Sequence, residues 1–161
     1  LTDCLGRRSG EEVIETLWHY SVRNNTNLSV AFVDLDHFKK VNDTFGHQIG
    51  DAVLSHTASI IKRSLRKSDF VIRWGGEEFL VVMPDANIQN ATTVLSRMAG
   101  KGFGERPDGS LQTVSIGIAE RINDKTNNED SLIKVADTRL YQAKTDGRSR
   151  AVGVETVILK E

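Results

Sequence analysis

A hairpin near the middle of the chain is the feature that most constrains its fold. Two apolar runs, at residues 70–72 and 79–83, flank a glycine pair at 75–76. A Gly-Gly pair suits the tip of a β-hairpin, because glycine adopts positive φ without steric cost. Glu77 and Glu78 follow at once, and neighbours on an extended strand point to opposite faces. By itself this is most simply a solvated acidic turn, since charges and glycines collect in loops, so any further role depends on what lies beside it.

Apolar periodicity predicts the other elements. Helical spacing predicts helices over residues 10–23, 38–45, 54–66, 88–98 and 132–143. Ser9 is the expected N-cap of the first helix. Alternating or continuous apolar runs predict strands over residues 28–33, 69–74, 77–83, 114–118 and 154–159.

The order of the central elements is strand, helix, strand, strand, helix, strand. This βαββαβ order predicts an α+β, ferredoxin-like fold, in which an antiparallel sheet carries helices on one face. In such a sheet the first strand is a neighbour of the hairpin. That strand ends in Asp34-Leu35-Asp36, so we expect Asp34 to lie beside Glu77 at the hairpin tip.

The length and composition bound the class of protein. The 161 residues fit one domain, and a formal net charge of -1 excludes bulk attraction to nucleic acid or to an acidic membrane surface. Cys4 is the only cysteine, which rules out an internal disulfide and suits a reducing compartment. No apolar run approaches the roughly 20 residues of a membrane span.

These bounds lead to expectations about organisation and location. We expect a single domain over residues 1–161 that acts in the cytoplasm, free or tethered to the inner membrane through a preceding region. The abrupt start at Leu1-Thr2-Asp3 indicates the C-terminal part of a longer signalling protein. The domain itself is expected to touch neither membrane nor nucleic acid polymer.

The carboxylates at the end of the first strand and at the hairpin tip indicate a cation site. Carboxylates this close repel each other unless a positive charge lies between them. Mg²⁺ typically binds one or two carboxylates together with phosphate oxygens of a substrate. A pair of metals can stabilise both the attacking and the leaving oxygen of a phosphoryl displacement. The pattern therefore favours a nucleoside triphosphate as substrate.

Other common phosphate-binding motifs are absent from the sequence. There is no G-x-x-x-x-G-K-[ST] sequence, and Glu105 interrupts the dinucleotide pattern that the glycines at 100–104 begin. Main-chain amides at the start of the short helix and nearby cations would hold the phosphates instead. These groups are His37, Phe38, Lys39, Lys144 and Arg148.

Several motifs occur in the order and at the spacing of one known family. They are Asp34-Leu35-Asp36-His37-Phe38-Lys39, Asn42-Asp43, Phe45-Gly46-His47, Gly50-Asp51, Gly75-Gly76-Glu77-Glu78-Phe79, Val114-Ser115-Ile116-Gly117, Tyr141-Gln142-Ala143-Lys144 and Gly147-Arg148. Together they resemble the GGDEF-domain diguanylate cyclases, in the GGEEF variant, over nearly the whole chain. The resemblance implies the nucleotidyl cyclase palm, an α+β fold.

The resemblance implies roles for the residues of the acidic cluster. Asp34, Glu77 and the main-chain carbonyl of Leu35 correspond to the metal ligands. Glu77 is also the candidate for taking the proton of the 3′-hydroxyl. Lys39 corresponds to the lysine that stabilises charge in the transition state. Glu78 corresponds to a glutamate that either binds metal or supports the site.

The resemblance also implies a substrate site. Its residues are Phe38, Asn42, His47, Asp51, Lys144 and Arg148. Asn42 and Asp51 correspond to the residues that read guanine, and a carboxylate suits the two N–H donors on the Watson–Crick edge of that base. Lys144 and Arg148 match the cations that contact phosphates.

A second site is implied by Arg66-Lys67-Ser68-Asp69. An R-x-x-D sequence at this distance before the glycine pair corresponds to the product-inhibition site of the family. Arg97 matches a further arginine that some members use there. Without the resemblance, an arginine and an aspartate three residues apart are ordinary at a helix-to-strand junction.

The sequence departs from the family pattern at three places. The segment Leu1–Arg8 keeps the L-T and R-R of the family but lacks the usual glycine and asparagine between them. The stretch between Met98 and Thr113 is short, and Ser149 replaces a common asparagine. These changes concern loop geometry and dimer contacts more than catalysis.

The implied activity is that of a diguanylate cyclase. It condenses two GTP into cyclic di-GMP and two pyrophosphates with two Mg²⁺ or Mn²⁺ per active site, and it requires a homodimer because each domain holds one GTP. One alternative is an inactive domain that only binds cyclic di-GMP at Arg66 and Asp69. Another is a cyclase that accepts adenine, against which the aspartate at position 51 argues.

Overall fold

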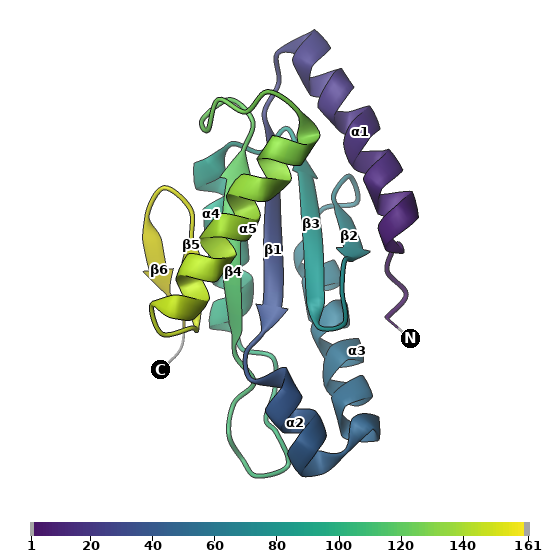
Figure 1. Cartoon of the computed structure of the whole chain (residues 1–161), viewed down its shortest axis with the longest axis vertical. Helices are drawn as coiled ribbons and strands as arrows, with labels where there is room; N and C mark the ends of the chain where they lie inside the picture. The colour runs from purple at the N-terminus through teal and green to yellow at the C-terminus, as the bar shows by residue number, and fades with distance from the viewer. Residues whose placement is uncertain (1, 160–161) are drawn as a thin grey trace.

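The computed structural model describes residues 2–159 and contains one six-stranded sheet in the order β2-β3-β1-β4-β5-β6 (Figure 1). The strands are β1 (Leu28–Leu35), β2 (Phe70–Arg73), β3 (Glu78–Pro84), β4 (Val114–Glu120), β5 (Arg150–Val152) and β6 (Thr156–Ile158). The helices are α1 (Arg7–Asn24), α2 (Phe38–Phe45), α3 (His47–Ser64), α4 (Ile88–Gly100) and α5 (Glu129–Thr145). Leu1, one half of the L-T match, lies outside the described residues, as do positions 160–161.

Strand β1 lies at the centre of the sheet, and all eight of its residues are buried. It pairs antiparallel with β3 on one side and with β4 on the other. The α+β class and the βαββαβ order are thus confirmed. The two short strands after α5 extend the sheet, and β5 pairs parallel with β4.

Helices cover both faces of the sheet, so the expectation of helices on one face is wrong. Figure 1 shows α1 and α5 in front of the sheet, with α3 and α4 behind it. Phe32 and its same-face neighbours pack with α1 and α5, whereas Val33 belongs to the cluster that contains α3 and α4. Both faces of β1 are apolar, and each therefore needs its own layer of helices.

Three details of the elements differ from the expectations. Helix α1 begins at Arg7 with Gly6 as its N-cap, and Ser9 lies inside the first turn rather than capping it. Helix α3 begins at His47, because Gly46 with φ 90° ends α2 and redirects the chain. Strand β5 was not predicted, whereas the strand predicted over residues 154–159 is present as β6.

Helix α5 packs unusually closely on β4. A Cβ on Gly117 would meet the main chain of α5 at the carbonyl oxygen of Ala136 and the amide nitrogen of Leu140. A hydrogen bond also joins the two elements, since Nη1 of Arg139 donates to the Ile118 carbonyl oxygen at 2.7 Å. This contact fixes where the end of α5 meets the end of β1.

The segment before α1 borders the sheet at β2. The Leu5 amide donates to the Val71 carbonyl at 3.2 Å, and the Arg73 amide donates to the Leu5 carbonyl at 2.8 Å. This segment therefore covers the outer edge of the strand that leads to the hairpin tip. No helix within residues 2–159 combines the length and the apolar character that crossing a bilayer requires.

Candidate active site

Asp34 lies at the carboxyl end of β1 and is only 4% exposed. Its Oδ2 atom lies 2.6 Å from Nζ of Lys144, which comes from the last turn of α5. Its Oδ1 atom is buried and has no hydrogen-bond partner within residues 2–159. Burial raises the pKa of Asp34 above its ordinary value, and the hydrogen bond and charge of Lys144 oppose this shift. One carboxylate oxygen is therefore available to a further positive ligand.

The hairpin brings both glutamates to Asp34. Glu78 is the direct partner of Asp34 in the β1–β3 ladder. The Leu35 amide donates to the Glu77 carbonyl at 3.3 Å, which holds the tip against the end of β1. Burial, followed by the charges of Asp34 and Asp137, raises the pKa of Glu78 to about 7. The expected approach of Asp34 and Glu77 is present, since both line one pocket.

This pocket has a volume of about 430 Å³ and collects charges of both signs. It is lined by Asp34, Leu35, His37, Phe38, Lys39, Lys40, Asp43, Glu77, Lys144 and Arg148. Helix α2 contributes its first turns, and its N-cap His37 has φ 57°. The pocket therefore joins the predicted metal ligands to all three of the predicted phosphate-binding cations.

Lys40 and Asp43 line the pocket without having been predicted to do so. Asp43 follows Lys39 by four residues and Lys40 by three on α2, so it lies on the same side of this helix as both lysines. The short helix was predicted, and this spacing is the signal that would have identified Asp43.

The predicted guanine-reading residues, Asn42 and Asp51, do not line this pocket. Asn42 lies on α2, whereas Asp51 and His47, another residue of the predicted substrate site, lie at the start of α3, where both are exposed. The Oδ1 atom of Asn42 occupies the space that a Cβ on Gly50 would need. The glycine thus allows α2 and α3 to approach each other at this place.

Asp36 differs from Asp34 in that both of its carboxylate oxygens accept hydrogen bonds within the protein. Its Oδ1 atom accepts from the Ser115 hydroxyl at 2.6 Å, and its Oδ2 atom accepts from the Thr113 hydroxyl at 2.6 Å. The Ser149 amide also donates to Oδ2, at 3.1 Å. Asp36 is therefore no candidate for the cation site.

The predicted metal ligands in this pocket are two carboxylates and one main-chain carbonyl. Within residues 2–159 no three side chains of His, Cys, Asp or Glu gather in a way that could hold a metal. The unpartnered Oδ1 of Asp34, together with Glu77 and the carbonyl of Leu35, nevertheless fits a hard cation that completes its shell with phosphate oxygens and water. Lys144 supplies the positive charge beside Asp34 in this structure.

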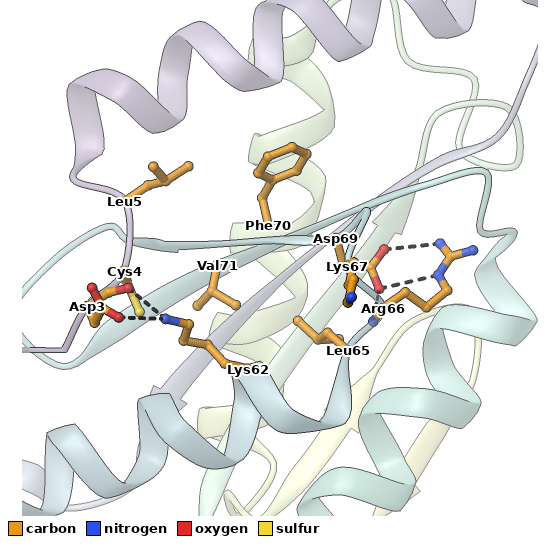
Figure 2. A pocket seen from close by; sticks show the side chains of 10 residues that line it. All are labelled: Asp3, Cys4, Leu5, Lys62, Leu65, Arg66, Lys67, Asp69, Phe70 and Val71. Atoms are coloured by element: carbon orange, nitrogen blue, oxygen red, sulfur yellow. Dashed lines mark hydrogen bonds and ion pairs between the residues drawn. The ribbon is translucent and has the colours of Figure 1, made fainter.

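Arg66 and Asp69 form a second polar site. Their side chains meet at 3.0 Å between Nη2 and Oδ1, and Asp69 also accepts from the Arg66 amide at 2.9 Å. Arg66 donates further to the Pro84 carbonyl at 2.7 Å. Figure 2 shows this pair at one end of a pocket of about 460 Å³, with the Lys62–Asp3 pair at the other.

Arg97 does not line the pocket of Arg66 and Asp69. It lies on α4 and lines a separate hollow between α3 and α4, together with Arg63 and Lys101. The structure therefore brings together two of the three residues predicted for the inhibitory site.

The chain is similar to proteins of known family. A family model described as diguanylate cyclase, GGDEF domain, matches residues 1–150. The response regulator PleD of Caulobacter vibrioides is 35% identical over 159 residues, which cover 95% of this chain and 35% of PleD. The diguanylate cyclase DgcM of Escherichia coli is 35% identical over 158 residues, which cover 94% of this chain and 37% of DgcM. The chain thus spans about a third of the length of these relatives.

Solved structures show the same fold. The GGDEF domain of DgcB from Caulobacter crescentus, in complex with c-di-GMP, aligns with a TM-score of 0.86 and 31% identity over 96% of this chain and 90% of that chain. The active GGEEF domain of a diguanylate cyclase from Vibrio cholerae aligns with a TM-score of 0.88 over 95% of this chain and 99% of that chain. Its 24% identity supports a common fold alone. Because the family model matches most of the chain and the fold agrees, this chain belongs to the GGDEF domain family of diguanylate cyclases.

Proposed function

We propose that this domain is a catalytically competent diguanylate cyclase that condenses two GTP into cyclic di-GMP and two pyrophosphates. The observation that carries the proposal is the pocket in which Asp34 and Glu77 face Lys144 and Arg148. Carboxylates alone would repel a triphosphate, and cations alone would not activate a hydroxyl. A pocket with both suits phosphoryl transfer between nucleotides.

Two Mg²⁺ or Mn²⁺ ions held by Asp34, Glu77 and the carbonyl of Leu35 would neutralise phosphate charge when bound. Glu77 takes the proton of the 3′-hydroxyl, whose oxygen bonds to the α-phosphorus of the other GTP. The bond from that phosphorus to the bridging oxygen breaks, and pyrophosphate leaves. A second such step closes the ring.

The cations of the pocket stabilise the charge that develops on the phosphates. Lys39 faces the transferring phosphate, whereas Lys144 and Arg148 hold the leaving pyrophosphate. Glu78 lies opposite Asp34 in the ladder and adds a further carboxylate to the acidic side of the site.

Residues of α2 and α3 hold the rest of the nucleotide. Asp51 accepts hydrogen bonds from the N–H donors of the guanine edge, and the amide of Asn42 donates to or accepts from the same edge. Phe38 and His47 complete the surface against which the nucleoside lies.

Catalysis requires two copies of the domain. One pocket holds one GTP, and each α-phosphate must meet the 3′-hydroxyl of the other nucleotide. Two domains facing each other about a two-fold axis satisfy this geometry. The rate per domain should therefore rise with protein concentration.

We also propose that the product binds at Arg66 and Asp69 and inhibits. The pair is already formed in the structure, and the related DgcB domain has c-di-GMP bound. A domain that only binds the product is the competing possibility. The complete acidic and cationic set of the pocket supports the enzyme instead.

The test is incubation of the purified domain with GTP and Mg²⁺ over a range of protein concentrations, followed by chromatographic separation of the nucleotides. We expect cyclic di-GMP and two equivalents of pyrophosphate from the parent. Asp34→Asn and Glu77→Gln should fold but give no product, because each removes a metal ligand at almost constant volume. Unconverted GTP at every parent concentration, or product from either variant, would contradict the proposal.

A further inference from the structure

We infer that Asp36 is a positioning residue for the phosphate site, because its buried carboxylate fixes the turn that carries Arg148. The inference rests on the function proposed above. It assigns separate tasks to the two aspartates of the Asp34-Leu35-Asp36 sequence.

Asp36 is itself held firmly. It is 1% exposed. The hydroxyl of Thr113, just before β4, and that of Ser115, on β4, each donate to one of its carboxylate oxygens at 2.6 Å. Its main-chain carbonyl accepts from Arg106 at 3.1 Å and from Gln112 at 3.0 Å. Four donors from residues 106–115 therefore fix the position of both its side chain and its main chain.

The turn after α5 has a conformation that needs external support. Gly147, Arg148 and Ser149 all have positive φ, at 123°, 61° and 47°. Left-handed backbone is unfavourable for residues that carry a Cβ, and here two such residues follow each other. Such conformations persist where surrounding contacts over-determine them.

Asp36 connects this turn to the carboxyl end of β1. The Arg148 amide donates to the Ala143 carbonyl at 2.9 Å, and the Ser149 carbonyl accepts from the Leu159 amide at 2.9 Å. Both bonds stay within residues 143–159. The 3.1 Å bond from the Ser149 amide to Asp36 instead ties the turn to the strand that carries Asp34.

The two aspartates thus each control one cation of the pocket. Asp34 contacts Lys144 directly at 2.6 Å. Asp36 holds the residue after Arg148, and Arg148 lines the same pocket as Asp34 and Lys144. Asp36 is the first residue after β1, so the short Asp34-Leu35-Asp36 sequence reaches both the end of α5 and the turn that follows.

A purely structural role for Asp36 makes a different prediction from a role through Arg148. If Asp36 acts through Arg148, its replacement weakens nucleotide binding only while Arg148 is present. If Asp36 merely stabilises the fold, its replacement weakens binding to the same extent with or without Arg148. A double-mutant cycle separates the two.

The experiment measures binding of α,β-methylene-GTP with Mg²⁺ by calorimetry to the parent, Asp36→Asn, Arg148→Ala and the double variant. We expect Asp36→Asn to weaken binding about tenfold, the loss of one charge-assisted contact between Arg148 and phosphate. In the Arg148→Ala background we expect the same replacement to change binding less than about twofold. Thr113→Val is the matched control: it removes one donor to Asp36 but leaves the bond to Ser149, and its binding should stay near that of the parent.

Equal weakening in both backgrounds, or parent-like binding by Asp36→Asn, would overturn the inference. Should Asp36→Asn fail to fold in a thermal melt, a semisynthetic protein with an ester in place of the Ser149 amide tests the same contact from the other side, because it lacks the N–H that donates to Asp36. Proline cannot serve here, since its ring excludes the positive φ of Ser149. The ester variant is expected to bind as weakly as Arg148→Ala, and parent-like binding would refute the inference. Failure of the parent to bind the analogue would instead count against the proposed function.

Discussion

Glu78 lies directly opposite Asp34 in the antiparallel ladder between β3 and β1. Like charges in such a pair destabilise a sheet. Burial is the main cause that raises the pKa of Glu78 from its ordinary 4.5 to about 7, and the charge of Asp34 adds to it. The sequence placed the two glutamates of the hairpin on opposite faces, and the structure shows that Glu78 is the one on the face of Asp34.

The raised pKa of Glu78 predicts a pH-dependent cost to stability. Between about pH 4.5 and pH 7 the folded state binds a proton that the unfolded state releases, so stability falls as the pH rises through this window. Glu78→Gln removes the charge. We expect it to melt at a higher temperature than the parent at pH 8 in the presence of a chelator, and at about the same temperature at pH 4.5. A constant difference across this range would contradict the assignment.

Lys144→Met should expose the cost of leaving Asp34 without a cation. The variant loses the 2.6 Å ion pair and leaves the buried carboxylate of Asp34 without its ion-pair partner. Because Lys144 is partly exposed, we expect a loss of about 2 kcal/mol at neutral pH. Added Mg²⁺ should restore more stability to this variant than to the parent.

Denaturant unfolding with and without Mg²⁺ measures both effects. Lys134→Met is the control, since Lys134 lies on the same helix but is exposed. An equal response to Mg²⁺ in the parent and in Lys144→Met would show that Lys144 does not compete for the carboxylate.

Asp51→Ser should relax the choice of base. A site that pairs with both N–H donors of guanine leaves its own carboxylate unpaired when adenine enters, which can be worth on the order of 10⁴-fold in discrimination. We expect the ratio of kcat/KM for GTP over ATP to fall by at least about tenfold. His56→Ala, on the same helix, should leave the ratio unchanged. An unaltered ratio in Asp51→Ser would remove this residue from the guanine site.

Arg66→Ala should weaken product inhibition while initial turnover stays nearly unchanged. The variant loses charge-assisted hydrogen bonds worth roughly 1.5–3 kcal/mol, which corresponds to ten- to hundredfold weaker binding. Initial rates against added cyclic di-GMP give the inhibition constant. Arg23→Ala serves as a surface control on α1, and superimposable inhibition curves for Arg66→Ala and the parent would refute the inhibitory site.

Gly117→Ala should destabilise the domain by roughly 1–3 kcal/mol, because the added methyl group would overlap the main chain of α5. Gly153→Ala is the control, since a Cβ there would meet its nearest atom at an ordinary 3.5 Å. Urea unfolding of both variants measures the difference. A Gly117→Ala protein as stable as the Gly153→Ala protein would show that α5 can move away from β4 at no cost.

The sequence was sufficient for those features that depend on strand order. The approach of the hairpin to Asp34 follows from the βαββαβ pattern, because β3 must lie beside β1. The role of Asp36 could not be predicted, since its partners Thr113, Ser115 and Ser149 lie 77 to 113 residues away. Contacts of that kind depend on loop conformations, which apolar periodicity does not determine.

Local rules failed where a tertiary contact overrode them. Ser9 is a good N-cap by residue type, but Leu5 pairs with β2, and the chain turns into α1 directly after Gly6. The placement of Arg97 away from Arg66 likewise depends on how α4 packs against α3, which a position along the sequence does not reveal.

The ion pair between Asp34 and Lys144 joins residues 110 positions apart, and this separation sets the order in which the site comes into being during synthesis. Both β1 and the hairpin leave the ribosome well before α5, so their carboxylates are made before Lys144 and Arg148. A domain generally folds as a unit, and α5 supplies part of the apolar layer on one face of β1. A nascent or clipped chain that ends before α5 therefore carries the carboxylates without two of the three cations proposed to bind phosphate. On the proposed function, such an incomplete copy of the domain should consume no GTP.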